Sequence, residues 1–213
     1  MGLFVLGLVL FLGAHSLRVF AEGWRTRLIA RLGDKLFKGF HSLASLVGLV
    51  LMVYGFGLVR WDSPLLWAPP VAMRHVAALL MLVSLVLLVA AYVPHNTFKA
   101  RLRHPMVLSV KVWALAHLLA NGRLADLILF GAFLVWAVLN FRASRQRDRQ
   151  AAASLADTNL AAQPSASTSD AAADLALPSV NHNARVILIG VGAWLVLLFG
   201  GHTWLFGVSP IGY

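Results

Sequence analysis

Long runs of apolar residues alternate with shorter polar segments along almost the whole chain. A run of about 20 apolar residues is long enough to cross the hydrocarbon core of a bilayer as an α-helix. Six runs reach or approach this length. We therefore predict an all-α protein, a polytopic bundle of about six transmembrane helices. The predicted spans cover residues 2–17, 41–59, 71–93, 105–120, 124–141 and 186–208.

The composition supports a membrane protein over a soluble one. Of the 213 residues, 60% are hydrophobic and only 12% are charged, whereas a soluble domain carries about 25% charged residues. Cysteine is absent, which excludes disulfides, thiolate metal sites and cysteine nucleophiles. No basic residue precedes the first apolar run and no small-residue cleavage site follows it, so we expect a retained span and not a signal peptide.

The basic residues predict how the spans are oriented. The formal net charge is +10, from 18 basic and 8 acidic residues, a balance that is often typical of nucleic-acid binding. Here the cations gather in the loops after spans one, three and five, and the other loops contain few. Cytoplasmic loops carry such an excess. We therefore expect a multi-pass protein of the cell inner membrane with both termini outside, whose partner is the lipid bilayer and not a nucleic acid.

The spans form one membrane domain that a linker interrupts. Residues 1–141 hold the first five spans, and residues 185–213 hold the sixth span and a C-terminal tail of the same domain. The stretch 142–184 is rich in Ala, Ser, Thr, Asp and Gln. Such a segment buries too little apolar surface to order itself, which predicts a disordered cytoplasmic linker. Few residues join spans four and five, so we expect a tight helical hairpin that turns at Asn121–Gly122.

The first loop has a helical pattern of its own. Large apolar residues recur at every fourth position from Trp24 to Phe40, with cations between them and a break near Gly33. This pattern favours an amphipathic segment that lies on the inner surface of the membrane. A solvated basic linker is the alternative.

Ionisable residues inside a span are costly and are therefore candidates for function. Of the eight histidines, three lie deep: His15 in span one, His117 in span four and His202 in span six. His41 and His75 lie near span ends, where an interfacial position is expected, and solvation explains the other three. The deep histidines leave two interpretations open, hydrogen bonds between helices or ligation of a cofactor.

The surroundings of the deep histidines limit the kind of cofactor. We expect no acidic residue inside any span, with Asp126 in the fourth loop beside Arg123. Hard cations require carboxylates, and structural zinc usually takes four nitrogen or sulfur ligands. Two imidazoles between apolar walls suit b-type haem, whose porphyrin supplies the other four ligands. Lys111, a further charge within a span, is expected to extend to the inner surface.

Four stretches resemble the NnrU family. The most specific runs from Arg103 to Gly122 and contains Trp-Ala-Leu-Ala-His at 113–117. The others are the histidine of the apolar first helix, the Phe-x-x-Phe-His-Ser string at 37–42, and Gly-His-Thr-Trp at 201–204. The resemblance covers nearly the whole chain outside the linker. It implies a membrane protein associated with denitrification, which supports the production of active nitric oxide or nitrite reductase.

The NnrU family is also related to the membrane-bound 15-cis-zeta-carotene isomerase, a b-haem protein. The span-four histidine of the isomerase is a haem ligand and matches His117, and its other candidate ligand matches His15 less securely. The resemblance therefore implies a haem b whose iron is ligated by His15 and His117. One turn before the span-four histidine the isomerase has a cysteine, proposed as a switchable ligand, where this chain has Ala114. That difference puts ligand switching in doubt.

The depths of the histidines add a reserve ligand. Counting 1.5 Å per residue along the predicted spans separates the Cα atoms of His15 and His117 by about 10 Å in depth. Helix tilt, typically about 20°, and a slanted haem reduce that difference. His202 lies closer to the level of His117, so the alternative pair is His117 with His202.

Three functions follow as hypotheses. The leading one is a non-catalytic, haem-associated protein that supports nitrogen-oxide respiration through redox sensing or reductase maturation, with reductase components as partners. The second is an enzyme, a haem-dependent cis–trans isomerase of a polyene lipid. The third is a histidine proton relay without a cofactor. An absorbance spectrum separates the third from the first two, and co-expression with a cis-polyene separates the second from the first.

Overall fold

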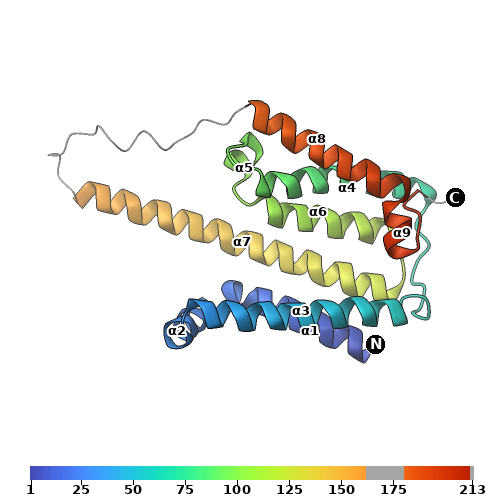
Figure 1. The fold of residues 1–213 in the computed structure, drawn as a ribbon, viewed down its shortest axis with the longest axis horizontal. Helices are drawn as coiled ribbons and strands as arrows, with labels where there is room; N and C mark the ends of the chain where they lie inside the picture. The colour runs from blue at the N-terminus through green and yellow to red at the C-terminus, as the bar shows by residue number, and fades with distance from the viewer. Residues whose placement is uncertain (162–179, 212–213) are drawn as a thin grey trace. The chain divides into compact units, whose positions relative to one another are not determined.

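The computed structural model describes residues 1–161 and 180–211, and all of its regular structure is helical within these ranges. Figure 1 shows the elements in chain order. They are α1 (Gly2–Phe20), α2 (Glu22–Leu32), α3 (Asp34–Val59), α4 (Val71–Tyr92), α5 (Thr97–Leu102), α6 (Pro105–Ala120), α7 (Leu124–Ala161), α8 (Val180–Val196), a π-helical turn (Leu197–Gly201) and α9 (His202–Phe206).

Every predicted span coincides with an apolar helix. Within the described ranges, five helical segments are long and apolar enough to cross a bilayer, formed by α1, α3, α4, α7 and the C-terminal helices. The exception is α6, with 16 residues, which extend about 24 Å at 1.5 Å per residue against a hydrocarbon core of about 30 Å. The prediction of an all-α, multi-pass membrane protein is confirmed, whereas a sixth complete span stays a prediction.

The helices on both sides of the predicted linker extend beyond the apolar runs that predict them. α7 continues to Ala161 and α8 begins at Val180. Residues 142–161 and 180–184 of the predicted disordered linker are therefore helical, and the prediction is wrong for them. The physical reason in 142–161 is propensity, because this stretch is rich in Ala, Arg and Gln, which favour helix even without an apolar face. The rest of the predicted linker, residues 162–179, lies outside the described residues.

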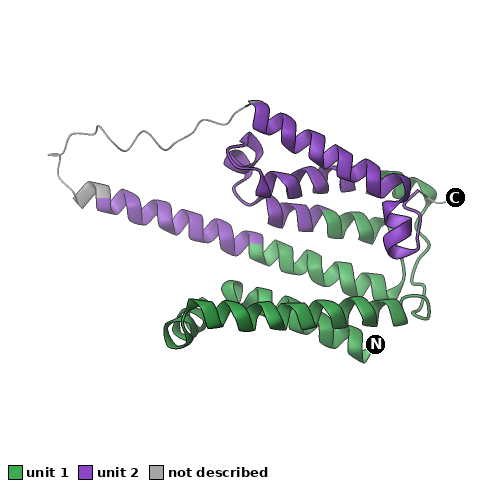
Figure 2. Cartoon of the chain, in the orientation of Figure 1, with its two compact units in different colours: residues 1–77, 113–140 green, residues 78–112, 141–213 purple. Residues whose placement is uncertain are grey.

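The chain divides into two compact units, coloured separately in Figure 2. Unit 1 comprises Met1–Ala77 and Trp113–Asn140, and unit 2 comprises Ala78–Val112 and Phe141–Tyr213. The boundary cuts α6 and α7, so each unit takes part of both helices. His15, His41 and His117 all belong to unit 1, and His202 belongs to unit 2.

Unit 1 is built on the close approach of α1 and α3, which lie side by side (Figure 1). A Cβ atom added to Gly7 would lie 2.2 Å from the backbone nitrogen of Met52, and one added to Gly55 would lie 2.5 Å from that of Phe4. Small residues at such crossings let two backbones meet in a membrane, where packing replaces the hydrophobic effect. Phe4, Leu8, Met52, Leu129 and Phe130 form the buried core beside this crossing.

One end of unit 1 is closed by a polar network, which we call the closed end and define by Arg60, Ser63, Arg123 and Asp126. The guanidinium of Arg123 donates to the carbonyls of Trp61 and Ser63, both at 2.8 Å. The Ser63 hydroxyl donates to the carbonyl of Arg60 at 2.9 Å. These bonds hold the loop after α3 against the start of α7.

The closed end corrects the expectation that no acidic residue lies in a span. Asp126 is in the first turn of α7 and is 2% exposed. Its carboxylate faces the Arg60 side chain at 3.9 Å. A carboxylate is stabilised at a helix N-terminus by the helix dipole, and the neighbouring arginine compensates its charge. Asp126 is therefore a structural part of α7 and not a loop residue.

The turn between α6 and α7 is short, as expected for a tight helical hairpin. α6 ends at Ala120 and α7 begins at Leu124. The Gly122 carbonyl accepts a hydrogen bond from the Leu66 amide at 2.8 Å. A Cβ atom at Gly122 would lie 1.9 Å from the Trp67 carbonyl oxygen, so only glycine allows this approach.

Unit 2 pairs its helices through polar side chains. The Ser84 hydroxyl of α4 donates to the Ser109 carbonyl of α6 at 3.0 Å. The Trp194 indole of α8 donates to the Ala78 carbonyl at 2.8 Å. Hydrogen bonds of this kind join helices within the bilayer. Near the start of α8, the side-chain amide of Asn183 donates to the hydroxyl of Thr97 at 2.7 Å.

Candidate functional site

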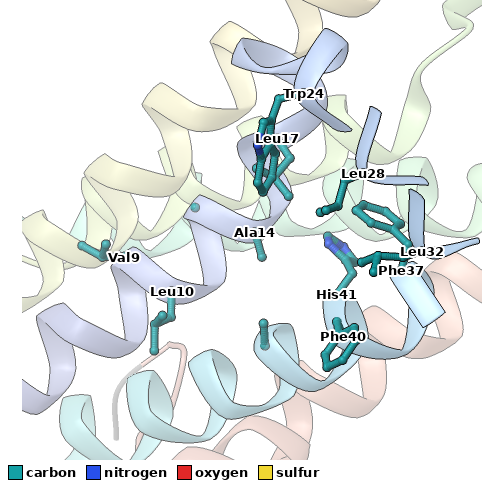
Figure 3. A pocket seen from close by; sticks show the side chains of 12 residues that line it. Val9, Leu10, Ala14, Leu17, Trp24, Leu28, Leu32, Phe37, Phe40 and His41 are labelled. Carbon is teal, nitrogen blue, oxygen red and sulfur yellow. The ribbon is translucent and has the colours of Figure 1, made fainter. Parts of the chain in front are cut away.

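The candidate site begins with the helix that connects α1 to α3. α2 is the amphipathic segment expected in the first loop, and it ends at Gly33, whose φ of 80° separates it from α3. This φ is in the left-handed region, which glycine adopts without strain. Within this loop, Trp24, Leu28 and Leu32 face a common cavity (Figure 3). The predicted helix and its break are confirmed, and its position on a membrane surface stays a prediction.

His15 is half-buried on α1 and makes a defined hydrogen bond. Its Nδ1 atom lies 2.8 Å from the carbonyl oxygen of Phe11, one turn earlier. A carbonyl can only accept, so Nδ1 carries the proton, and in the neutral ring Nε2 carries the lone pair. The His15 ring also meets the Trp136 ring edge-on, with centroids 6.2 Å apart.

His41 lies beside His15, with ring centroids 5.5 Å apart. It is on α3, and its ring stacks on Phe37 one turn earlier, at 6.0 Å between centroids. The Nδ1 atom of His41 is buried and has no hydrogen-bond partner in the described structure, and the same holds for the indole nitrogen of Trp136. We call this region, with His15, His41 and Trp136, the histidine end of unit 1.

His117 lies on α6 and repeats the hydrogen bond of His15. Its Nδ1 atom is 2.9 Å from the carbonyl oxygen of Trp113, again one turn earlier. As for His15, the carbonyl can only accept, so Nδ1 carries the proton, and in the neutral ring Nε2 carries the lone pair. The His117 ring stacks on Phe130 of α7, with centroids 4.5 Å apart and planes at 29°.

Aromatic rings separate His15 from His117. Phe11, Phe133 and Trp113 form a ladder, with centroids 5.9 Å apart for the first pair and 5.3 Å for the second. On α7, the ring neighbours of the two histidines are Trp136 and Phe130, six residues apart, which corresponds to about 9 Å along the helix axis. The structure therefore brings His15 together with His41, and it places His117 at another level of the same unit.

His202 lies in unit 2, at the start of α9. Its Nδ1 atom is 2.7 Å from the carbonyl oxygen of Val208, and its ring meets that of Phe206 at 4.9 Å. All three histidines named as candidate ligands thus share one feature, an Nδ1 atom that is hydrogen-bonded to a backbone carbonyl. None of the other described histidines makes a hydrogen bond of this kind.

The other polar residues considered above have simpler surroundings. Lys111 places its ammonium 5.1 Å from the centroid of the Phe141 ring, a cation–π contact. His75 is exposed on the first turns of α4. His104 pairs with Asp148 at 3.0 Å, and both residues belong to unit 2.

Two adjoining cavities open at the histidine end. The larger is about 390 Å³ and is lined almost entirely by apolar side chains of α1, α2 and α3 (Figure 3). The smaller is about 290 Å³ and is lined by His15 together with Arg18, Arg25 and Lys38. Ala14, Leu17, Phe37 and His41 line both cavities.

Comparison with known protein families agrees with the motifs that carry the resemblance. Residues 3–210 match the family described as NnrU protein, which is nearly the whole chain. The chain belongs to the NnrU family. No curated protein and no solved structure shows significant similarity to it.

In this NnrU family chain, the most specific motif falls on α6 and contributes to both units. Its first half, from Pro105 to Val112, is in unit 2, and its second half, with Trp113 and His117, is in unit 1. Ala114, one turn before His117, is fully buried.

Sequence reasoning missed the position of His41 relative to His15. The apolar run of span two begins at His41, and this pattern predicts an interfacial position for the histidine. The helix begins at Asp34, which places His41 seven residues into α3, while His15 is five residues from the end of α1. α1 and α3 are antiparallel and are joined by the short α2 segment. His15 therefore lies about 8 Å before the end of α1, and His41 lies about 10 Å after the start of α3, at a similar height. This count could have predicted the pair.

Proposed function

We propose that the chain is a b-haem-associated membrane protein that supports nitrogen-oxide respiration, through redox sensing or through production of active nitric oxide or nitrite reductase. The observation that carries the haem part is the shared hydrogen bond of the candidate histidines, Nδ1 to a backbone carbonyl. Histidines that ligate metals usually donate their other ring nitrogen in this way, which fixes the tautomer and aims the ligating nitrogen.

The donor set fits haem better than a bare metal ion. Among the described residues there is no group of three or more His, Cys, Asp or Glu side chains that could hold an ion alone. A porphyrin supplies four ligands itself and needs only one or two from the protein. When bound, a b-type haem would supply an iron centre for electron transfer or for binding a small gas such as nitric oxide.

In this proposal His15 is one axial ligand, and either His117 or His41 is the other. His117 is the partner that the resemblance implies, and the aromatic ladder lies between it and His15. His41 is next to His15 and needs no displacement of the ladder. His202 remains the reserve ligand.

Single substitutions in haem-replete protein test the ligands. Reduced-minus-oxidised spectra should be recorded for His15→Ala, His117→Ala, His41→Ala and His202→Ala. We expect loss or a strong decrease of the b-type signal in His15→Ala and in one of the other variants, which identifies the second ligand. His75→Ala is the matched control, because this histidine is exposed.

Two outcomes would overturn parts of this proposal. A full haem signal that survives both His15→Ala and His117→Ala would end the ligation by these residues. The absence of any signal in haem-replete wild type would end the cofactor proposal and favour a cofactor-free proton relay.

The physiological part needs a separate test. In a denitrifying host that lacks its own family member, the wild-type chain should restore nitric oxide or nitrite reductase activity, and the His15→Ala variant should not. If the wild-type chain and the His15→Ala variant both restored reductase activity, the supporting role would not require haem ligation by His15. A haem-dependent isomerase receives less support, because Ala114 replaces the cysteine of the related isomerase.

A further inference from the structure

The two cavities at the histidine end differ in chemistry and share four lining residues. The larger is an apolar groove between α1, α2 and α3, in which Trp24, Leu28 and Leu32 come from the amphipathic helix (Figure 3). The smaller carries the cations Arg18, Arg25 and Lys38. Since Leu17, Phe37 and His41 are among the residues that line both, an elongated molecule could lie with one end in each cavity.

The smaller cavity is complementary to an anion. Its ionisable lining residues are the three cations together with His15 and His41, and no acidic residue lines it. Arg25 also lies over the Phe37 ring, 5.6 Å from its centroid, which holds the guanidinium at the cavity.

Two acidic residues near this cavity pair with its cations along the helices. Glu22 pairs with Arg25, and Asp34 pairs with Lys38, at i,i+3 and i,i+4 spacing. Neither acid lines the cavity. Exposed ion pairs of this kind are weak, so a phosphate that enters the cavity can compete with the carboxylates.

We propose that this composite site binds one anionic phospholipid, with its phosphate in the cationic cavity and an acyl chain in the apolar groove. Basic pockets between transmembrane helices near a membrane surface are suited to such headgroups. The volume of the groove, about 390 Å³, is within the range of small-molecule sites, roughly 300–1,000 Å³. The bound lipid would hold α2 against α1 and α3. This inference goes beyond the proposed function and does not depend on haem.

Native mass spectrometry of the purified full chain in detergent tests the headgroup. Dioleoyl phosphatidylglycerol and dioleoyl phosphatidylcholine should be added separately, and the population with one bound lipid measured. Wild type should retain phosphatidylglycerol preferentially. Each cation near an anionic headgroup strengthens binding about fivefold, so Arg25→Gln/Lys38→Gln should weaken retention of phosphatidylglycerol about 30-fold.

A matched variant separates the cavity from general surface charge. Arg31→Gln/Lys35→Gln removes two cations from the same helices, and neither residue lines a cavity. This control should keep the preference for phosphatidylglycerol. Equal loss in both double variants, or no preference in wild type, would overturn the proposal.

A second pair of variants tests the groove. Ala44→Phe fills the apolar groove and should lower retention of both lipids, whereas Leu43→Phe adds a ring at an exposed neighbouring position outside the groove and should not. Equal retention by both would overturn the placement of the acyl chain. Helical circular dichroism of the same samples shows whether each variant is folded, whether or not haem is bound, so failure of the lipid site is distinguishable from failure of the haem proposal.

Discussion

The two ends of unit 1 differ in what surrounds their buried polar groups. At the closed end, the guanidinium of Arg123 makes two hydrogen bonds of 2.8 Å. The buried Oδ1 atom of Asp126 has no hydrogen-bond partner in the described structure, but it faces the cationic side chain of Arg60 at 3.9 Å. At the histidine end, the ring of His41 and the indole of Trp136 each bury a nitrogen that has no hydrogen-bond partner in the described structure. The cavities also open at this second end.

This difference indicates that the closed end stabilises the fold, whereas the histidine end is the candidate binding site. Leaving a buried polar group without a hydrogen bond costs free energy, about 1–3 kcal/mol. At the closed end, the hydrogen bonds of Arg123 and the charge of Arg60 beside Asp126 offset that cost. The histidine end retains it, which is expected where a ligand completes the hydrogen bonds. Substitutions at the two ends should therefore change stability in different directions.

The largest expected effect concerns the crossing that supports both ends. In Gly55→Ala, the added Cβ would lie 2.5 Å from the Phe4 nitrogen, and because the obstacle is backbone, α1 and α3 must separate. We expect a loss of about 3 kcal/mol in the free energy of unfolding, at the upper end for overpacking. Denaturant titration in detergent micelles, followed by helical circular dichroism, measures it.

Gly57→Ala is the matched control for the crossing. This glycine is on the same helix and has open space where the Cβ would lie. Helix propensity alone should make the variant equal to wild type or more stable by up to about 1 kcal/mol. Equal behaviour of the two variants would contradict the close approach of α1 and α3.

A smaller loss is expected at the closed end. Asp126→Asn keeps the shape of the side chain and removes the charge that compensates Arg60. Breaking a buried ion pair costs about 3–5 kcal/mol. Here we expect about 2 kcal/mol, because Arg60 keeps its contacts with the rings of Phe56 and Trp61. Asp62→Asn, at an exposed position in the same loop, should change stability by less than about 0.5 kcal/mol in the same titration. Equal losses in both variants would remove the special role of the closed end.

The sequence predicts most of the fold because the bilayer imposes a simple rule. Every backbone polar group in the hydrocarbon must be bonded within a helix, so apolar runs identify the helices. The same rule explains what the pattern misses. Outside the hydrocarbon, helices continue where propensity favours them, as α7 does to Ala161 and as α3 does before His41.

The candidate site is predicted less completely. Residue type and depth identify His15 and His117 as unusual, and the structure places both in one unit. Their separation by the rings of Phe133 and Trp113 depends on how α1, α6 and α7 pack, which periodicity does not encode. The contact of His15 with His41 depends on the length of the connection between α1 and α3. Tertiary packing, and not local pattern, decides which of the histidines meet.

The smallest expected effect is a gain in stability, whereas the substitutions above are expected to cause losses. His41→Phe replaces a ring that stacks on Phe37 with another ring of similar shape, and it removes the buried nitrogen that lacks a partner. Replacing an unsatisfied polar group by an apolar one of the same shape is neutral or stabilising. In protein without haem and without added anionic lipid, we therefore expect unchanged stability or a gain of up to about 1 kcal/mol. His15→Phe is the matched control at the same end, because it loses the hydrogen bond to the Phe11 carbonyl and should cost about 1 kcal/mol. A clear loss of stability in His41→Phe would show that this nitrogen has a partner in the apoprotein, and the contrast between a bonded end and an end kept for a ligand would then no longer hold.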